Sequence, residues 1–142
     1  TTLFRSHMAG IIIATHGNMA KAMLESAELI VGKQENVETL GLNHGDSIDE
    51  FSRKLEDGIE KYKDEGVLVL LDFYGGTPFN TSAIIINKFA KVCELECLTG
   101  VNLPMLLELF LNRDTMKLKD LKNLCEEVGI SGIKDVKTVL KL

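Results

Sequence analysis

A histidine and an aspartate each stand at the end of an apolar run. His16 follows Ile11–Thr15, and Asp72 follows Val67–Leu71. Short apolar runs of this kind are typical of buried parallel strands, whose carboxyl ends meet at one edge of a sheet. At that edge, a carboxylate that binds one imidazole nitrogen fixes the tautomer and leaves the other nitrogen as a nucleophile or a general base. We therefore predict that His16 and Asp72 touch and act as a pair.

A glycine-rich loop follows the aspartate. Gly75 and Gly76 let backbone N–H groups approach a ligand closely, and Thr77 adds a hydroxyl donor. A helix is expected to begin just after them, and the N-terminus of a helix attracts anions. With His16 beside it, the loop suits a phosphoryl group carried on the imidazole. The plainer alternatives are a core or capping role for His16, a helix cap for Asp72 and an ordinary turn at the glycines.

Length and composition describe one globular domain. The chain has 142 residues, of which 45% are hydrophobic and 26% are charged, and its formal net charge is -5. This balance disfavours a nucleic-acid surface, and no apolar run approaches the roughly 20 residues of a membrane helix. Residues 1–7 are interpreted as a cloning remnant ahead of a natural start at Met8, and residues 8–142 as a single domain.

Motifs for other chemistries are missing from the sequence. The chain has no Gly-x-Gly-x-x-Gly motif, no Gly-x-x-x-x-Gly-Lys-Ser/Thr loop and no Gly-x-Ser-x-Gly elbow. His44 is interpreted as a solvated loop residue, so no set of histidines for a metal remains, and neither a metal nor a cofactor is expected. Cys93, Cys97 and Cys125 are expected to be reduced thiols of a cytoplasmic protein. Four residues of one strand would separate Cys93 from Cys97 by about 13 Å, too far for a disulfide.

Strands and helices alternate along the chain. Apolar runs predict strands at about 10–15, 37–42, 67–71 and 92–98, and helical spacing predicts helices at about 19–31, 48–63, 78–89, 104–111 and 118–128, the last ending at Gly129. The tail, about 132–140, is expected to add a last strand. This alternation is typical of an α/β sheet with right-handed crossovers. The loop Gly100–Pro104 would then join those of His16 and Asp72 at the carboxyl edge, where open α/β sheets bind ligands.

Three segments of the chain resemble one protein family. They are Ile13–Gly17, Leu71–Asn80 and Gly100–Met105, in this order and each at a strand end. They are similar to the enzyme IIA component of the mannose-type bacterial sugar phosphotransferase system, and the resemblance covers essentially all of residues 8–142. It implies a three-layer α/β/α fold with a mainly parallel sheet in the order 2-1-3-4. It also implies a homodimer, and some family members exchange a C-terminal edge strand between subunits.

The resemblance implies a mechanism as well. A histidine phosphocarrier protein would phosphorylate His16 on Nε2 while Asp72 holds Nδ1. Gly75, Gly76 and Thr77 would line the phosphoryl site. His16 would then pass the group to an enzyme IIB partner, which phosphorylates the sugar during import. The protein would work in the cytoplasm and reach the membrane only through the permease, whose components choose the sugar.

Transfer between two proteins favours a dry, fairly flat patch around the nucleophile. The candidates for this partner surface are Phe73, Tyr74, Asn102, Leu103 and Met105, with ordinary core packing as the alternative. Position 73 varies in the family, so the resemblance gives Phe73 no chemical role.

Two other functions stay open. One is the IIA-like subunit of a dihydroxyacetone kinase system, which shares the fold and the histidine, although Gly75–Asn80 favours the mannose type. The other is a non-catalytic α/β module that binds a small anion or a protein at the same edge, without a phosphoryl group on His16. Some family members continue into a linker and a fused IIB domain. The sequence ends at Leu142 without one, as expected of a stand-alone or shortened IIA protein.

Overall fold

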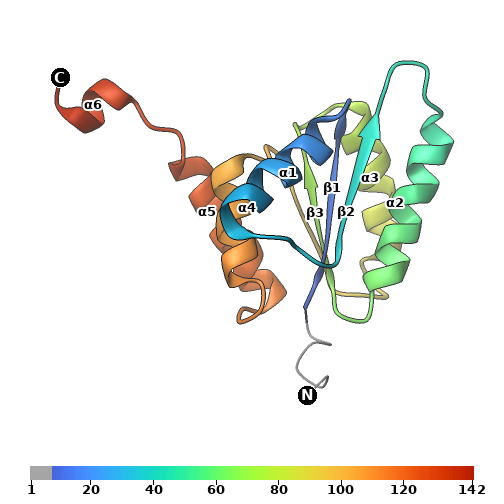
Figure 1. Ribbon diagram of the computed structural model, residues 1–142. Helices are drawn as coiled ribbons and strands as arrows, with labels where there is room; N and C mark the ends of the chain where they lie inside the picture. Colours follow the sequence, from blue (N-terminus) through green and yellow to red (C-terminus); the bar gives the residue numbers. More distant parts are fainter. Residues whose placement is uncertain (1–7) are drawn as a thin grey trace.

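One parallel sheet lies at the centre of the protein, and the computed structural model describes residues 8–142 around it (Figure 1). Its strands are β1 (Gly10–His16), β2 (Val37–Leu42), β3 (Val67–Leu71) and β4 (Leu95–Leu98). Neighbouring strands are parallel, in the order β2-β1-β3-β4. The strand order implied by the family resemblance is therefore confirmed. Residues 1–7, interpreted as a cloning remnant, lie outside the described residues.

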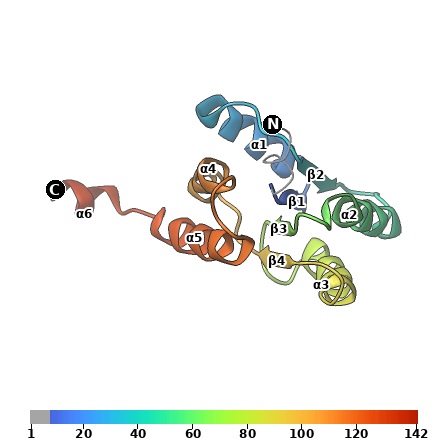
Figure 2. The same cartoon turned by 90° about the horizontal axis from the view of Figure 1, so that it is seen from below.

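Helices cover both faces of the sheet and complete three layers (Figure 2). On one face lie α2 (Ile48–Tyr62) and α3 (Thr77–Phe89), and on the other lie α1 (Met19–Val31), α4 (Leu103–Asn112) and α5 (Leu118–Ser131). The predicted three-layer α/β/α fold is confirmed. No helix within residues 8–142 is both long and apolar enough to cross a membrane.

The sheet separates two apolar cores. Ile11 and Ile13 of β1 belong to the core beside α1, α4 and α5, whereas Ile12 and Ala14 belong to the core beside α2 and α3. Successive side chains of a strand point to opposite faces, so a strand that is apolar at every position contributes to both cores. This is why the continuous apolar runs of β1 and β3 predict central strands.

The C-terminal segment differs from the prediction. Residues 136–140 form the short helix α6 (Val136–Leu140), and the expected C-terminal edge strand is absent from the described residues. The segment leaves the body of the protein after α5, so it meets no strand with which it could pair (Figure 1). Its backbone bonds locally instead, for example from the Val139 N–H to the Asp135 carbonyl at 2.9 Å. Within the described chain, β4 therefore keeps one edge without a neighbouring strand.

The last strand of the sheet is shorter than predicted. It begins at residue 95 rather than near 92, because the N–H groups of Val92 and Cys93 both bond to the Phe89 carbonyl and continue the turn after α3. Cys93 therefore lies before the strand that carries Cys97. All three cysteines are free, as expected.

The fifth helix is longer than predicted. α5 continues through Gly129 to Ser131. A Cβ added to Gly129 would lie 2.8 Å from Met105 Cε. This glycine therefore lets α5 pack closely on α4, and it does not end the helix.

Candidate active site at the carboxyl edge of the sheet

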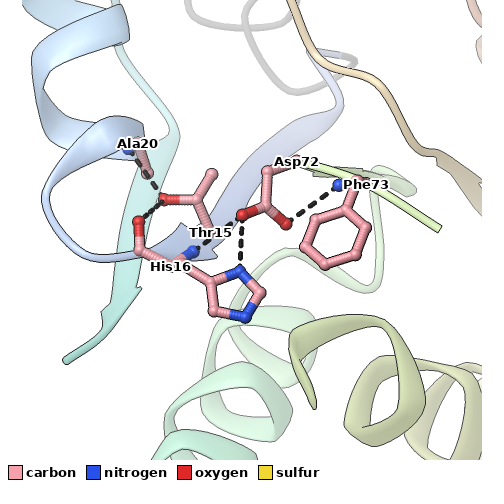
Figure 3. Close-up of polar contacts among 5 residues, drawn as sticks. All are labelled: Thr15, His16, Ala20, Asp72 and Phe73. Carbon is pink, nitrogen blue, oxygen red and sulfur yellow. Dashed lines mark hydrogen bonds and ion pairs between the residues drawn. The ribbon is translucent and has the colours of Figure 1, made fainter. Parts of the chain in front are cut away.

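His16 and Asp72 lie side by side at the carboxyl ends of β1 and β3. The two strands are neighbours, and the pairing of Ala14 with Leu71 brings their ends together. Asp72 Oδ2 accepts a hydrogen bond from the His16 backbone N–H at 2.9 Å and bonds to His16 Nδ1 at 2.7 Å (Figure 3). The other carboxylate oxygen, Oδ1, accepts the Phe73 N–H at 2.9 Å. The predicted contact between His16 and Asp72 is confirmed.

The surroundings of Asp72 favour its charged form. Burial of the carboxyl group opposes ionisation, but the hydrogen bonds from the backbone and ring of His16 and from the Phe73 N–H outweigh burial and hold the pKa of Asp72 below its ordinary value of 3.8. A carboxylate only accepts hydrogen bonds, so the proton between the two groups sits on Nδ1. In the neutral imidazole, Nε2 is then the nitrogen with a free lone pair. The His16 side chain is 44% exposed and that of Asp72 is 8% exposed, so the imidazole is accessible from solvent while the carboxylate is covered.

The start of α3 lies against the imidazole. Gly76 is the residue before the helix, and a Cβ added to it would lie 2.8 Å from His16 Cε1. Gly75 has a φ of 98°, a conformation that glycine adopts without strain. Thr77 is the first helical residue, and the first N–H groups of a helix have no partner within it. The structure thus brings the predicted glycine loop to the edge of the histidine ring.

The loop Gly100–Pro104 joins the site through its backbone. The Gly100 N–H donates to the Asp72 carbonyl at 3.1 Å. The Asn102 side chain turns inward, where it accepts the Met105 N–H at 3.0 Å as the cap of α4 and donates to the Gly129 carbonyl at 3.1 Å. Met105 is only 3% exposed and fills the core. The prediction that Met105 belongs to a partner surface is therefore wrong, and the Asn102 side chain is committed to contacts within the protein.

Two of the predicted surface residues are exposed aromatic side chains in the loop after β3. Phe73 is 53% exposed and Tyr74 is 76% exposed. The Phe73 ring stacks on the His16 imidazole, with centroids 5.4 Å apart and 21° between the planes. The Tyr74 ring packs instead against Phe79, with centroids 4.4 Å apart. Leu103, the remaining candidate, is half-buried against the core.

Thr15 supports the site, although the motifs assign it no role beyond its place in the segment Ile13–Gly17. Its Oγ1 donates to the His16 carbonyl at 3.0 Å and accepts the Ala20 N–H at 2.9 Å (Figure 3). The fully buried hydroxyl therefore fixes the backbone of His16 and the first turn of α1 together. The one available signal was a threonine at a strand-to-helix junction, where its hydroxyl often bonds to the local backbone.

The described residues hold no cluster of metal ligands. Within residues 8–142, no group of three or more His, Cys, Asp or Glu side chains is arranged to bind a metal ion. His44, the other histidine in this part of the chain, is exposed in the loop between β2 and α2, as predicted.

Comparisons with known proteins agree with this geometry. A family described as "PTS system fructose IIA component" matches residues 10–126. The mannose-specific EIIAB component of the phosphotransferase system of Escherichia coli (strain K12) is 36% identical over 130 residues, a match that covers 89% of this chain and 39% of that protein. The fructose-specific EIIA component of Bacillus subtilis (strain 168) is 35% identical over 117 residues, covering 82% of this chain and 78% of that protein.

A solved structure extends the likeness to the fold. The crystal structure of phosphotransferase system component EIIA from Streptococcus agalactiae has a TM-score of 0.85 and 35% identity, covering 92% of this chain and 99% of that chain. The present chain therefore spans nearly all of a solved EIIA component, and 39% of the length of the E. coli relative. The family match, these relatives and the shared fold show that the chain belongs to the mannose-type enzyme IIA family of the sugar phosphotransferase system, whose members act in phosphoryl transfer.

Proposed function

We propose that His16 carries a phosphoryl group on Nε2, accepts it from the histidine phosphocarrier protein and passes it to an enzyme IIB protein. The proposal rests on the 2.7 Å contact between Asp72 Oδ2 and Nδ1, which leaves Nε2 as the free nitrogen. The similarity to the EIIA components of Bacillus subtilis and Streptococcus agalactiae supports the same role.

The transfer exchanges one nitrogen–phosphorus bond for another. The lone pair of Nε2 attacks the phosphorus of the donor's phosphohistidine, and the new bond forms while the donor's bond breaks. The proton on Nδ1 stays in its bond to Asp72, so the positive charge that develops on the phosphorylated ring faces a carboxylate. In the second transfer, a nitrogen or sulfur nucleophile of the acceptor attacks the phosphorus, its new bond forms while the Nε2–phosphorus bond breaks, and the Nε2 lone pair is restored.

In this proposal, the start of α3 binds the phosphoryl oxygens. Backbone N–H groups of Gly75, Gly76 and Thr77, with the Thr77 hydroxyl, would offset the negative charge of the group. The position of Gly76 against His16 Cε1 supports this assignment, because Cε1 adjoins Nε2 in the ring. The exposed rings of Phe73 and Tyr74 would contribute to the surface on which the partner proteins dock.

The test is a phosphorylation assay with intact mass measurement. The protein is incubated with phosphoenolpyruvate, enzyme I and the histidine phosphocarrier protein. The wild type is expected to gain one acid-labile phosphoryl group, and His16→Ala is expected to gain none. His44→Ala is the matched control, because it removes an exposed loop histidine and should gain the full group.

Two results would redirect the proposal. If the carrier protein is phosphorylated but the wild type gains nothing, the role fails for this donor, and the donor of a dihydroxyacetone kinase system becomes the next to test. If neither donor phosphorylates the protein while His16→Ala binds inorganic phosphate as the wild type does, the chain is a non-catalytic anion-binding module. Under the phosphocarrier role, the protein works in the cytoplasm and reaches the membrane only through the permease.

We also propose that the protein is a homodimer in which each tail covers β4 of the other copy. The open edge of β4 is flanked by a hollow of about 540 Å³ beside α3 and another of about 280 Å³ beside α5. The tail carries exposed apolar side chains, namely Ile133, Val136, Val139, Leu140 and Leu142. A tail added as a strand would pair the free backbone groups of the edge and place apolar side chains in both hollows.

A further inference from the structure

The ring of Phe73 lies nearly parallel to the ring that carries the proposed nucleophile. The centroids of the Phe73 and His16 rings are 5.4 Å apart and their planes differ by 21°, which is offset stacking. Phe73 is also tied to the site by its backbone, because its N–H donates to Asp72 Oδ1 at 2.9 Å (Figure 3). The Asp72 carboxylate thus binds both stacked residues, His16 through Oδ2 and Phe73 through Oδ1.

Gly76 lies against the Cε1 edge of the imidazole. A Cβ added to Gly76 would lie 2.8 Å from His16 Cε1 and 2.8 Å from Phe73 Cζ, so the backbone of Gly76 lies close to the edges of both rings. Asp72 holds Nδ1, Phe73 lies against one face and Gly76 lies at Cε1. Nε2 is the ring nitrogen that these contacts leave free.

A hydrogen bond at Nδ1 does not by itself fix the plane of the ring. The χ2 torsion of histidine is broad, so the imidazole can pivot about its Cβ–Cγ bond while Nδ1 stays near Asp72. Pivoting would turn the Nε2 lone pair away from the phosphorus, and phosphoryl transfer is sensitive to such misalignment. A flat ring stacked on the imidazole restricts that motion, and an aliphatic side chain does so less well.

We propose that Phe73 is a positioning residue that holds the His16 imidazole in the plane that directs Nε2 toward the incoming phosphoryl group. The role rests on the proposed phosphocarrier function, and it acts through His16. Phe73 is half exposed, so its side chain is not required to fill the core. The neighbouring Tyr74 is also exposed, but its ring packs on Phe79, which makes it a matched control for loss of an aromatic surface.

The experiment compares Phe73→Leu, Phe73→Tyr and Tyr74→Leu with the wild type. Leucine keeps an apolar side chain but removes the flat face, and tyrosine keeps the face. Long-range proton–nitrogen NMR spectra of the unphosphorylated protein report which nitrogen of His16 carries the proton. The wild type and Phe73→Tyr are expected to show sharp nitrogen signals with the proton on Nδ1. Phe73→Leu is expected to keep the proton on Nδ1, because Asp72 still binds it, but to show shifted and broadened nitrogen signals, because the ring samples more orientations.

Phosphorylation kinetics provide the second readout. At saturating carrier protein, where weaker docking no longer limits the rate, Phe73→Leu is expected to accept the phosphoryl group about three- to tenfold more slowly, the size of effect typical of a stacked aromatic pair. Phe73→Tyr should restore the rate. Tyr74→Leu should raise the half-saturating carrier concentration if Tyr74 helps docking, and should leave the nitrogen signals as in the wild type.

The two readouts separate failure of this role from failure of the phosphocarrier function. Normal phosphorylation kinetics and unchanged nitrogen signals in Phe73→Leu would overturn the positioning role and leave the phosphocarrier function intact. If the wild type accepts no phosphoryl group, the function fails, and altered nitrogen signals in Phe73→Leu would still support ring positioning. Thermal unfolding of each variant checks that the fold is retained.

Discussion

At the scale of single residues, the Asp72 carboxylate organises the site. It bonds to the backbone and ring of His16 through Oδ2 and to the Phe73 N–H through Oδ1. Asp72→Asn keeps the size of the side chain but removes the charge, and its single oxygen cannot replace both acceptors. We expect phosphoryl acceptance to fall about 100-fold, the size of a lost charge-assisted hydrogen bond. The phosphorylation assay measures this, and an Asp72→Asn protein within about threefold of the wild type would contradict it.

The same carboxylate makes stability depend on pH. The pKa of Asp72 is lowered in the folded protein, so the folded state favours the charged form more than the unfolded state does. The stabilisation is therefore complete above the ordinary value of 3.8 and is lost as the pH falls through the lower folded value. We expect the difference in free energy of unfolding between the wild type and Asp72→Asn to shrink in that acid range.

Chemical denaturation across pH measures this difference. Asp135, whose pKa is also lowered, titrates in both proteins and cancels when the two are subtracted. A difference that stays constant from neutral pH down through the acid range would show that Asp72 titrates alike in the folded and unfolded states.

The two loop glycines should respond in opposite ways to alanine. Gly76 has an ordinary φ of -81°, but a Cβ there would lie 2.8 Å from both His16 Cε1 and Phe73 Cζ. Gly76→Ala should therefore slow phosphoryl acceptance about tenfold with little loss of stability, because it displaces the reacting ring. Gly75 has a φ of 98° and open space around its Cβ position, so Gly75→Ala should instead reduce stability by about 1 kcal/mol. Phosphorylation rates and denaturation of both variants check the contrast.

At the scale of elements, the sequence predicts best where one physical signal dominates. The continuous apolar runs of β1 and β3 identify central strands because both faces are buried, and α1 follows from its helical spacing. The contact between His16 and Asp72 follows from the adjacency of those strands. The tail does not form the predicted strand. A strand needs a neighbouring strand to pair with, and the local sequence pattern does not show whether one is present.

The features of the site that the sequence does not predict depend on contacts between segments that are distant in the chain. The inward turn of Asn102 depends on the Gly129 carbonyl of α5, and the burial of Met105 depends on the packing of α5 against α4. The stacking of Phe73 on His16 depends on the loop conformation that Asp72 sets. Residue types at these positions do not reveal such geometry, because a side chain that follows a strand can point to either side.

Arg113, at the end of α4, links this helix to the amino ends of β1 and β2, at the edge of the sheet opposite His16. Its buried guanidinium donates to the Glu35 carbonyl at 2.7 Å and to the Ala9 carbonyl at 2.6 Å. Burial lowers the pKa of Arg113 to about 10, so it remains charged at neutral pH. Arg113→Met fills the space but leaves these carbonyls without a donor, and we expect the free energy of unfolding to fall by about 3 kcal/mol.

Denaturation and phosphorylation together test the role of Arg113. Arg53→Met is the control, because Arg53 is exposed and should change stability by less than about 0.5 kcal/mol. Phosphoryl acceptance by folded Arg113→Met should stay within about twofold of the wild type, since its contacts lie at the amino ends of β1 and β2. A loss of stability no larger than that of the control would show that the carbonyls find other donors.

At the scale of the whole molecule, the site and the proposed dimer contact use different edges of one sheet. His16 stands at the carboxyl ends of the strands, and the open side of β4 runs along the flank. Tyr74 borders both regions, because it is exposed beside Phe73 and also lines the hollow next to α3. Assembly through β4 would therefore leave His16 accessible while covering part of the neighbouring surface.

The proposed dimer predicts a concentration-dependent association that the tail controls. Val139 is exposed in the tail, so Val139→Asp should leave the stability of a single chain nearly unchanged. In a dimer, the same carboxylate would enter an apolar hollow, and the association should weaken at least about tenfold. Lys134→Asp, an exposed polar position of the same tail, should stay within about threefold of the wild type. Sedimentation velocity over a range of concentrations measures this, and equal association of Val139→Asp and the wild type, or a wild type that stays monomeric throughout, would contradict the tail exchange.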